Sequence, residues 1–440
     1  MMNSDVSYTE AFVWIWLPEM HDPVVAGKLF FSGEQLLFHY GRSYLARHNA
    51  ISIYEPELPL TSGVLPLPVG LHMPGSIRDA SPDAWGRRVL INQKLGLRDV
   101  HVGTNILNEL TYLLESGSDR IGALDFQLSA TEYVPRNPTN ASLADLLESA
   151  ERVEQGVPLT QELDQALYHG SSIGGARPKA LIEENGKKYI AKFSTSTDLY
   201  SVVKAEFVAM RLAQMAGIQV APVTLTQASG KDVLLIERFD RVFAEGNWQR
   251  RAVVSALTLF GLDEMMARYA SYEELTEIVR HRFTNAAKTL KELFSRLVFN
   301  ILCGNTDDHA RNHAAFWNGN MLSLTPAYDI CPQGRAGNEA SQAMLIAGEN
   351  RLSRLSHCLE GASHFLLSRN EAITIMEKQL HAIVDNWTEV CDIAQLNKTD
   401  RALLWGRQFL NAFAFEDLGE EARNLKRFAE KARGARSSSF

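Results

Sequence analysis

The segment Gly304–Asn312 carries the side chains best suited to catalysis in this sequence. Asp307 and Asn312 are separated by four residues, which is the D-x-x-x-x-N spacing of a kinase catalytic loop. Phosphoryl transfer needs a carboxylate that accepts or orients the incoming hydroxyl, and a neutral oxygen ligand for the magnesium ion that screens the phosphates. We therefore interpret Asp307 as the catalytic base and Asn312 as a ligand of Mg²⁺ and a contact of ATP. The spacing also recurs by chance, so the surrounding sequence has to support this interpretation.

A predicted hairpin follows this loop and leads to a further aspartate. His313–Trp317 and Met321–Thr325 are predicted strands, and the Asn-Gly dipeptide between them is a turn signal. Asp329 comes directly after the hairpin, where a kinase fold places its second magnesium ligand, so we assign it to Mg²⁺ and ATP binding. The structural alternative is that Asp307 and Asp308 cap a helix and that Asp329 lies in a turn.

The remaining polar residues of the loop have less defined roles. We assign His309 to ATP binding, because a histidine beside phosphates can donate a hydrogen bond, although a structural role explains it equally well. Asp308 is better explained as a structural residue, and its carboxylate could also raise the pKa of Asp307 or recruit metal. Arg311 is expected to face solvent or to pair with Asp308.

A second candidate site lies upstream, in the glycine-rich segment Ser171–Lys179. Glycines allow backbone N–H groups to approach an anion closely, so we interpret Ile173, Gly174 and Gly175 as contacts of ATP. The segment matches neither the Walker A pattern nor G-x-G-x-x-G. A tight turn between a helix and a strand explains it equally well.

A lysine and a hinge-like segment complete the candidate ATP site. Lys192 lies in a strand predicted after the glycine-rich segment, where kinases place the lysine that contacts the α- and β-phosphates. Glu206, on the following helix, is a candidate ion-pair partner, and an exposed helical glutamate is the alternative. Leu234–Asp240 marks the change from strands to helices, which is the hinge of a two-lobed kinase. There Glu237 and Phe239 would hold adenine through main-chain atoms.

The strands and helices that must position these residues are predicted in the order that a two-lobed kinase-like fold requires. Strands are predicted at 11–17, 24–31, 35–40, 179–182, 189–193, 220–226 and 233–236, and helices after Ser81 and Ser142 and over 202–215 and 290–302. The expected fold class is α+β: a two-lobed protein-kinase-like fold with a sheet-rich N-lobe, a helical C-lobe and a small N-terminal α+β accessory module. We place the module at residues 1–120, the N-lobe at 121–240 and the C-lobe at 241–440.

The composition excludes several other classes of protein. A chain of 440 residues with 45% hydrophobic content can bury real cores and is not disordered or fibrous. The net charge of -8 argues against a protein that coats nucleic acid. The four cysteines show no paired spacing and are expected to be buried thiols. The sequence has neither a signal peptide pattern nor a long apolar run, so a cytoplasmic protein without a membrane partner is expected.

Several segments resemble the HipA family of bacterial toxin kinases. They are Ser172–Lys179, Ile236–Arg241, Gly304–Asn312 and Leu324–Ile330, together with Ser81–Arg87 and Asp119–Leu124 in the N-terminal module. The resemblance implies an ATP- and Mg²⁺-dependent serine/threonine protein kinase. Its target would be a protein such as an aminoacyl-tRNA synthetase, whose inactivation halts translation and growth. It also implies a HipB-type DNA-binding antitoxin as partner, so that contact with nucleic acid is only indirect.

The resemblance adds roles for individual residues. It repeats the assignments made above for Asp307, Asn312, Asp329, Lys192, Glu237 and Phe239. It implies that Ser172 is autophosphorylated, and the added negative charge would lie where the phosphates of ATP bind, which would switch the enzyme off. Ser171, directly beside it, leaves the acceptor ambiguous.

Two other functions remain open on the sequence. A kinase of a small molecule or a lipid would use the same arrangement of Asp, Asn and Asp. A catalytically silent protein that binds an antitoxin as corepressor is the second alternative. The presence of Lys192, Asp307, Asn312 and Asp329 weighs against a silent protein.

Overall fold

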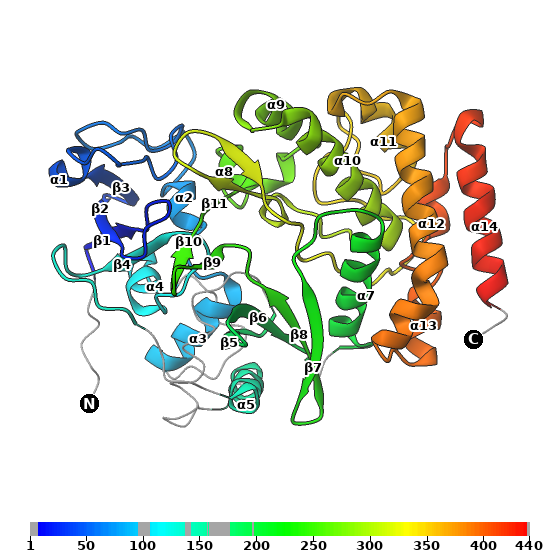
Figure 1. Ribbon diagram of the computed structural model, residues 1–440, viewed down its shortest axis with the longest axis horizontal. Helices are drawn as coiled ribbons and strands as arrows, with labels where there is room; N and C mark the ends of the chain where they lie inside the picture. Colours follow the sequence, from blue (N-terminus) through cyan, green and yellow to red (C-terminus); the bar gives the residue numbers. More distant parts are fainter. Residues whose placement is uncertain are drawn as a thin grey trace. The chain divides into compact units, whose positions relative to one another are not determined.

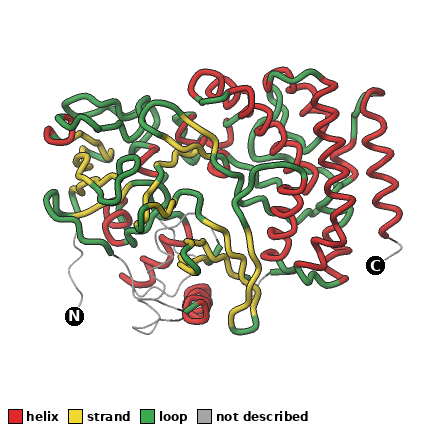
Figure 2. The backbone as a smooth tube through the Cα atoms, in the orientation of Figure 1, coloured by secondary structure: helices red, strands yellow, loops and turns green. Residues whose placement is uncertain are grey.

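The chain folds into two compact units, each assembled from several segments (Figure 1). The computed structural model describes residues 8–95, 106–136, 142–155, 157, 177–195 and 198–437. Unit 1 comprises Met1–Thr195, Thr226–Val254 and Phe316–Asn320, and unit 2 comprises Ser196–Leu225, Ser255–Ala315 and Met321–Phe440. Strands are concentrated in unit 1 and helices in unit 2 (Figure 2). The division at residues 120 and 240 stays a prediction.

Unit 1 begins with a four-stranded antiparallel sheet in the order β3-β2-β1-β4. Its elements are β1 (Glu10–Ile15), β2 (Val24–Ser32), β3 (Gln35–Tyr40), α1 (Arg42–Leu45), α2 (Gly75–Arg78), α4 (Glu109–Glu115) and β4 (Leu124–Gln127). Alternate residues of β1 point to one face of the sheet, and Ala11, Val13 and Ile15 are buried there. The first three strands confirm the predicted N-terminal sheet.

A second antiparallel sheet of unit 1 has the strand order β5-β6-β8-β7. The strands are β5 (Lys179–Glu184), β6 (Lys187–Phe193), β7 (Val223–Ala228) and β8 (Lys231–Glu237). The predicted Asn-Gly turn joins β5 to β6, and both of its residues have positive φ, as a two-residue hairpin turn requires.

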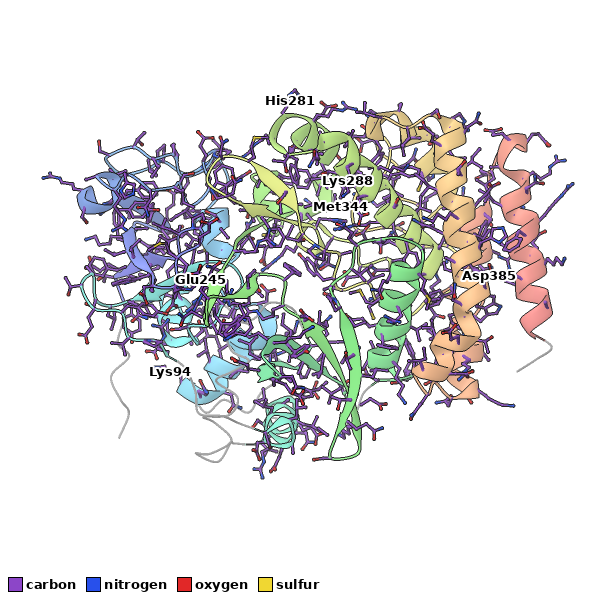
Figure 3. The ribbon with its side chains drawn as sticks, viewed as in Figure 1. Lys94, Glu245, His281, Lys288, Met344 and Asp385 are labelled. Atoms are coloured by element: carbon purple, nitrogen blue, oxygen red, sulfur yellow. The ribbon has the colours of Figure 1, made fainter. Side chains whose placement is uncertain are left out.

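Two helices pack on this second sheet. They are α3 (Ala84–Leu95) and α5 (Leu143–Glu154), and Trp85, Leu146 and Leu147 share a hydrophobic cluster with Phe193 of β6. The side chain of Ser142 caps α5 by accepting a hydrogen bond from the backbone N–H of Asp145, 3.2 Å away. Lys94, which is labelled in Figure 3, lies near the end of α3. It pairs with Glu115 of α4 at 2.8 Å. The helix start predicted at Ser142 is confirmed. The helix predicted after Ser81 is present, but it begins only at Ala84.

Strands that the sequence did not predict follow the second sheet. β9 (Arg241–Ala244) and β10 (Asn247–Arg250) form a hairpin, and β11 (Ala252–Ser255) lies in a three-stranded sheet in the order β11-β12-β13. The other two strands are β12 (Ala314–Trp317) and β13 (Leu322–Leu324), which confirm the hairpin predicted after the catalytic loop.

Unit 2 is built around helices. They are α7 (Val202–Met215), α8 (Ala256–Leu259), α9 (Tyr272–Arg282), α10 (Ala286–Cys303), α11 (Leu355–Gly361), α12 (Arg369–Ile393), α13 (Lys398–Leu404) and α14 (Arg423–Ser437), with short 3₁₀ turns η2 (Ala267–Tyr269), η3 (Ala310–Asn312), η4 (Ala362–Phe365), η5 (Ala412–Phe415) and η6 (Glu420–Ala422). α12 packs against α7, α10 and α14 (Figure 1). The predicted apolar face of α10 is buried throughout, because every third or fourth residue from Leu290 to Leu302 points into this packing. Among the described helices, none is long and apolar enough to cross a membrane.

The four cysteines are buried thiols that form no disulfide, as predicted. They are Cys303, Cys331, Cys358 and Cys391. Burial raises the pKa of the Cys303 thiol to about 12, so this thiol is not a nucleophile at neutral pH.

Candidate active site

The catalytic loop leaves α10 through a glycine that no other residue can replace without strain. Gly304 has φ 74°, in the left-handed region. A Cβ atom there would lie 2.7 Å from the carbonyl oxygen of Gln408. The next residue, Asn305, donates its backbone N–H to the carbonyl of Asn300 at 2.8 Å, which closes the end of the helix. The chain therefore turns sharply just before Asp307.

We expect Gly304→Ala to lower the free energy of unfolding by about 1–3 kcal/mol through the left-handed backbone alone, with a further cost from the contact with Gln408. Gly337→Ala is the matched control, since a Cβ there meets nothing within 4 Å and its φ is not positive. The control should stay within about 0.5 kcal/mol of wild type. Chemical denaturation of both variants checks the prediction, and equal stabilities would contradict it.

The structure brings Asp307 and Asn312 together, as their spacing predicted. The carbonyl oxygen of Asp307 accepts hydrogen bonds from the backbone N–H of His309 and from Nδ2 of Asn312, each at 2.9 Å. The carbonyl of His309 in turn accepts the backbone N–H of Asn312 at 2.8 Å. Because Nδ2 is held by the loop itself, the other end of the amide, the oxygen Oδ1, is the end presented as a ligand.

The charges around Asp307 show that a further predicted residue belongs to the same cluster. Partial burial raises the pKa of Asp307, and the carboxylates of Asp329 and Asp308 raise it further, while His309 opposes the shift. Asp329 is therefore close enough to Asp307 to repel its negative charge. Asp307, His309, Asn312 and Asp329 all lie in unit 2.

Asp329 is held in an unusual backbone conformation. Its φ is 58°, which is uncommon for a residue other than glycine. The residues before it are fixed by two hydrogen bonds: the backbone N–H of Ala327 donates to the carbonyl of Gln219 at 2.7 Å, and the hydroxyl of Tyr328 donates to the carbonyl of Arg311 at 2.7 Å. The second bond joins the segment before Asp329 directly to the catalytic loop. Left-handed aspartates of this kind concentrate at functional sites.

These residues fit a magnesium ion that is shared with a nucleotide. Within the described ranges, no cluster of three or more His, Cys, Asp and Glu side chains could hold a metal ion. Mg²⁺ in kinases needs fewer protein ligands, because phosphate oxygens and water complete its shell. The carboxylate of Asp329 and the amide of Asn312 are suitable ligands, and a cation there would relieve the repulsion that raises the pKa of Asp307.

Two neighbouring residues have other partners. Asp308 is buried and lies within hydrogen-bonding reach of Tyr272 and His313, which supports the structural interpretation. Arg311 pairs with Glu264 at 2.7 Å. This pair lies at the surface, with both side chains partly exposed, which agrees with the expectation that Arg311 faces solvent.

The predicted phosphate-contacting lysine lies in unit 1 and has a lysine opposite it. Lys192 of β6 is paired in register with Lys179 of β5, and both are buried. Cross-strand partners project to the same face of a sheet, so the strand pairing places both lysine side chains on one face. Lys179 was missed because register is not visible in the sequence. The ion pair of Lys192 with Glu206 of α7, which is buried in unit 2, stays a prediction.

The hinge residues also lie in unit 1. Glu237 ends β8, and its side chain pairs with Lys187 at 2.6 Å. The ring of Phe239 packs edge-on against that of Phe316, with centroids 5.8 Å apart. Both side chains are thus occupied by protein partners, which is compatible with the prediction that only their main-chain atoms contact adenine.

The predicted glycine-rich loop cannot be placed. Ser171, Ser172, Ile173, Gly174 and Gly175 lie outside the described residues. Their roles in ATP binding and autophosphorylation stay predictions.

Sequence reasoning missed a buried ionic cluster beside the hinge. The Asp240 carboxylate accepts two hydrogen bonds from Arg238, at 2.9 and 2.8 Å, one from Arg241 at 2.9 Å and one from the backbone N–H of Gly122 at 2.8 Å. Asp119 accepts from Arg241 at 2.7 Å and pairs with Arg238 at 3.1 Å. Both contributing segments are visibly rich in charged residues. The sequence alone does not show that the two segments lie close together in the fold. The cluster fixes the chain on either side of Phe239.

Comparison with known proteins identifies relatives over most of the chain. The HipA N-terminal domain family matches residues 17–127, and the HipA-like C-terminal domain family matches residues 171–387. The kinase-named protein Y4mE of Sinorhizobium fredii is 24% identical over 371 residues, covering 78% of this chain and 86% of that protein. The serine/threonine-protein kinase toxin HipA of Shewanella oneidensis is 27% identical over 183 residues, covering 36% of this chain and 42% of that protein.

A solved structure extends the comparison to the fold. A chain in the complex of HipA, HipB and operator DNA from the Shewanella oneidensis MR-1 toxin-antitoxin system has a TM-score of 0.62 and 19% sequence identity, covering 98% of this chain and 97% of that chain. At this identity the likeness shows the fold alone, and it confirms the predicted kinase-like α+β class. With both family domains matched in their expected order, the chain belongs to the HipA family.

Proposed function

We propose that this protein is an ATP-dependent serine/threonine protein kinase that acts as a HipA-type toxin. The observation that carries the proposal is the hydrogen bond from the Asn312 side chain to the carbonyl oxygen of Asp307. Asp329 lies close enough to repel the Asp307 carboxylate. Membership of a family whose relatives are named as kinases supports it. The target would be a protein, with an aminoacyl-tRNA synthetase as the example that family membership suggests, and its phosphorylation would inhibit translation and growth.

In the proposed reaction, Asp307 accepts the proton of the acceptor hydroxyl as the oxygen attacks the γ-phosphorus of ATP. The new O–P bond forms while the bond between the γ-phosphorus and its bridging oxygen breaks, so ADP leaves with the electron pair. Partial burial raises the pKa of Asp307, which makes its carboxylate a better proton acceptor than an ordinary aspartate. Asn312 and Asp329 would hold Mg²⁺, which supplies charge compensation on the phosphates.

The ATP contacts of the proposal are those that the sequence assigned. They are His309, Asn312, Asp329, Lys192, Glu237 and Phe239. We add Lys179 to this set, because it lies opposite Lys192 in the sheet and its charge suits a triphosphate. Ile173, Gly174 and Gly175 complete the assignment from the sequence.

The proposal is tested by incubating the protein with γ-labelled MgATP and a bacterial extract. Label in one extract protein, resolved by electrophoresis and identified by mass spectrometry, is the expected result. Label that appears only in metabolites or lipids would replace the protein kinase with a small-molecule kinase. An absence of any transfer, with ATP binding intact, would favour a silent binding protein.

Automodification is a separate expected outcome of the same incubation. We expect phosphate on Ser172 in the wild-type chain and in Ser171→Ala, and none in Ser172→Ala, as read by mass spectrometry of the peptide. Because phosphate at this position would add negative charge where ATP binds, wild-type transfer should decline with time while Ser172→Ala stays constant. Phosphate found on Ser171 instead would contradict the assignment.

We further propose a HipB-type DNA-binding antitoxin as partner. The support is the solved relative, which was determined as a complex of HipA, HipB and operator DNA. On this proposal the chain reaches DNA only through that partner. Purification of the chain from its native cells with any bound protein tests the proposal, and recovery of the chain alone would count against it.

A further inference from the structure

A buried hydrogen-bonded cluster includes one residue of the catalytic loop and two residues outside it. The proposed reaction uses none of its members. It consists of Tyr272, Asp308 and His313, which we call the loop clamp. The Tyr272 hydroxyl donates to Oδ2 of Asp308, and Nε2 of His313 lies 2.7 Å from Oδ1. The three residues are 0%, 1% and 3% exposed, respectively.

The cluster is charged rather than neutral. Burial alone would raise the pKa of Asp308, but His313, Tyr272 and Asn300 outweigh this effect, and the pKa is lowered. An ionised carboxylate only accepts hydrogen bonds, so Nε2 of His313 carries a proton. A buried charge of this kind adds little stability over an apolar core, and its better documented use is to fix one geometry.

The position of the clamp in the sequence matches that of the functional pair. Asp308 directly follows Asp307, and His313 directly follows Asn312. The contact between Asp308 and His313 therefore closes the same stretch of chain that separates the proposed base from the proposed metal ligand.

Neighbouring helices hold the clamp from several sides. Tyr272 is the first residue of α9, and the Asn300 side chain that hydrogen-bonds Asp308 belongs to α10. The carbonyl of His313 accepts the backbone N–H of Ala256, the first residue of α8, at 2.7 Å. Both ends of the catalytic loop are thus tied to helices of unit 2, while Asp307 itself is exposed.

We propose that the loop clamp positions Asp307 and Asn312 for phosphoryl transfer, an inference that rests on the proposed function of that pair. Asp308 shares a peptide unit with Asp307, and His313 shares one with Asn312, so loosening the clamp would let both functional residues shift. A displacement of about 1 Å at reacting groups can cost on the order of 10²-fold in rate. The clamp acts through position alone, and its members are positioning residues that touch neither ATP nor the acceptor.

Substitutions at the clamp test this proposal by kinetics. We expect Asp308→Asn and His313→Leu to lower kcat by on the order of 10²-fold, with KM for ATP changed by less than about threefold. Tyr272→Phe, which removes one hydroxyl, should have a smaller effect in the same direction. His313→Gln, whose side-chain amide can replace the Nε2 donor, should retain most of kcat. Equal losses in His313→Gln and His313→Leu would overturn the hydrogen-bond argument.

A matched variant separates positioning from general loss of stability. Gln379 of α12 is also buried in unit 2, and its Nε2 donates to the carbonyl of Ser295 in α10 at 2.8 Å. Gln379→Met should lower Tm without changing kcat. Clamp variants that behave in the same way, with a lower Tm and wild-type kcat, would show that the cluster is only structural.

Hydrogen exchange gives a readout that does not need activity. The backbone N–H groups of His309 and Asn312 are bonded within the loop, so their exchange reports whether the loop is held. We expect exchange in peptides covering 304–313 to rise at least about tenfold in Asp308→Asn but not in Gln379→Met. Unchanged exchange would refute the clamp. A wild-type protein without phosphoryl transfer would instead refute the proposed function, and the exchange result would still decide on the clamp.

Discussion

Asp307→Asn should lower kcat for phosphoryl transfer by about 10²- to 10⁴-fold, the range that a general base contributes. Asparagine has nearly the same size but cannot accept the hydroxyl proton. The hydrogen bonds that the loop makes to residue 307 use its carbonyl oxygen, so the loop geometry should survive the change. The affinity for MgATP should therefore fall little, or rise slightly because one repulsive carboxylate has been removed.

The measurement is single-turnover transfer from labelled MgATP together with equilibrium binding of a fluorescent ATP analogue. Asp385→Asn is the control, because Asp385 is an exposed aspartate on α12 (Figure 3). It should match wild type in both assays. Wild-type kcat in Asp307→Asn would remove Asp307 from the reaction, and a loss of ATP binding would assign it to nucleotide binding instead.

Local patterns in the sequence were enough to predict two of the long helices of unit 2, α7 and α10. The bounds predicted for α7 are those observed, because its apolar residues recur at helical spacing and Gly217, with φ 92°, ends the segment. The buried face of α10 followed from the same periodicity. In both cases the information is local, so no tertiary contact was needed for the prediction.

The catalytic loop was predictable for a related reason. Asp307 and Asn312 hydrogen-bond across only a few residues, so their spacing encodes their contact. Asp329 could be added because the intervening hairpin has a strong Asn-Gly turn signal. Most of the candidate site in unit 2 could therefore be predicted, because its residues are close together in the sequence.

Contacts between distant segments could not be predicted in this way. The hairpin of β9 and β10 was missed because each strand has only four residues and the turn is Glu245-Gly246 rather than Asn-Gly, although both turn residues have positive φ. The pairing of Lys179 with Lys192 depends on register, and one residue of slip would have sent them to opposite faces. Tyr272 reaches Asp308 from a separate helix. Such contacts follow from packing, which a single sequence does not display.

Asp240→Asn should destabilise unit 1 by about 3–5 kcal/mol, the usual cost of removing one partner from a buried ion pair. Asp240 is 1% exposed and lies between Arg238 and Arg241, which are themselves buried. Without the carboxylate, the two guanidinium groups keep the partly exposed Asp119 as the one charged partner that they share among the described residues. Urea denaturation followed by hydrogen exchange in peptides of each unit would report the loss for unit 1 separately.

The control for this variant is a surface ion pair in the same unit. Glu10 and Lys28 pair at 2.9 Å with substantial exposure on both sides, so Glu10→Gln should cost no more than about 1 kcal/mol. If Asp240→Asn and Glu10→Gln have equal effects, the buried cluster does not stabilise unit 1 in the way that its geometry indicates.

The same cluster predicts how the stability of unit 1 depends on pH. Burial alone would raise the pKa of Asp240, but Arg238 and Arg241 lower it below its ordinary value, and the pKa of Asp119 is lowered well below its own. A carboxylate with a depressed pKa in the folded state contributes stability above its unfolded-state pKa of about 3.9 and loses that contribution as the pH falls through the folded-state value. The urea midpoint of unit 1 should thus be steady from neutral pH to about pH 5 and fall steeply below about pH 4. In Asp240→Asn the fall should be shallower, because one of the two carboxylates that must be protonated is already gone, and an unchanged slope would mean that the acid sensitivity arises elsewhere.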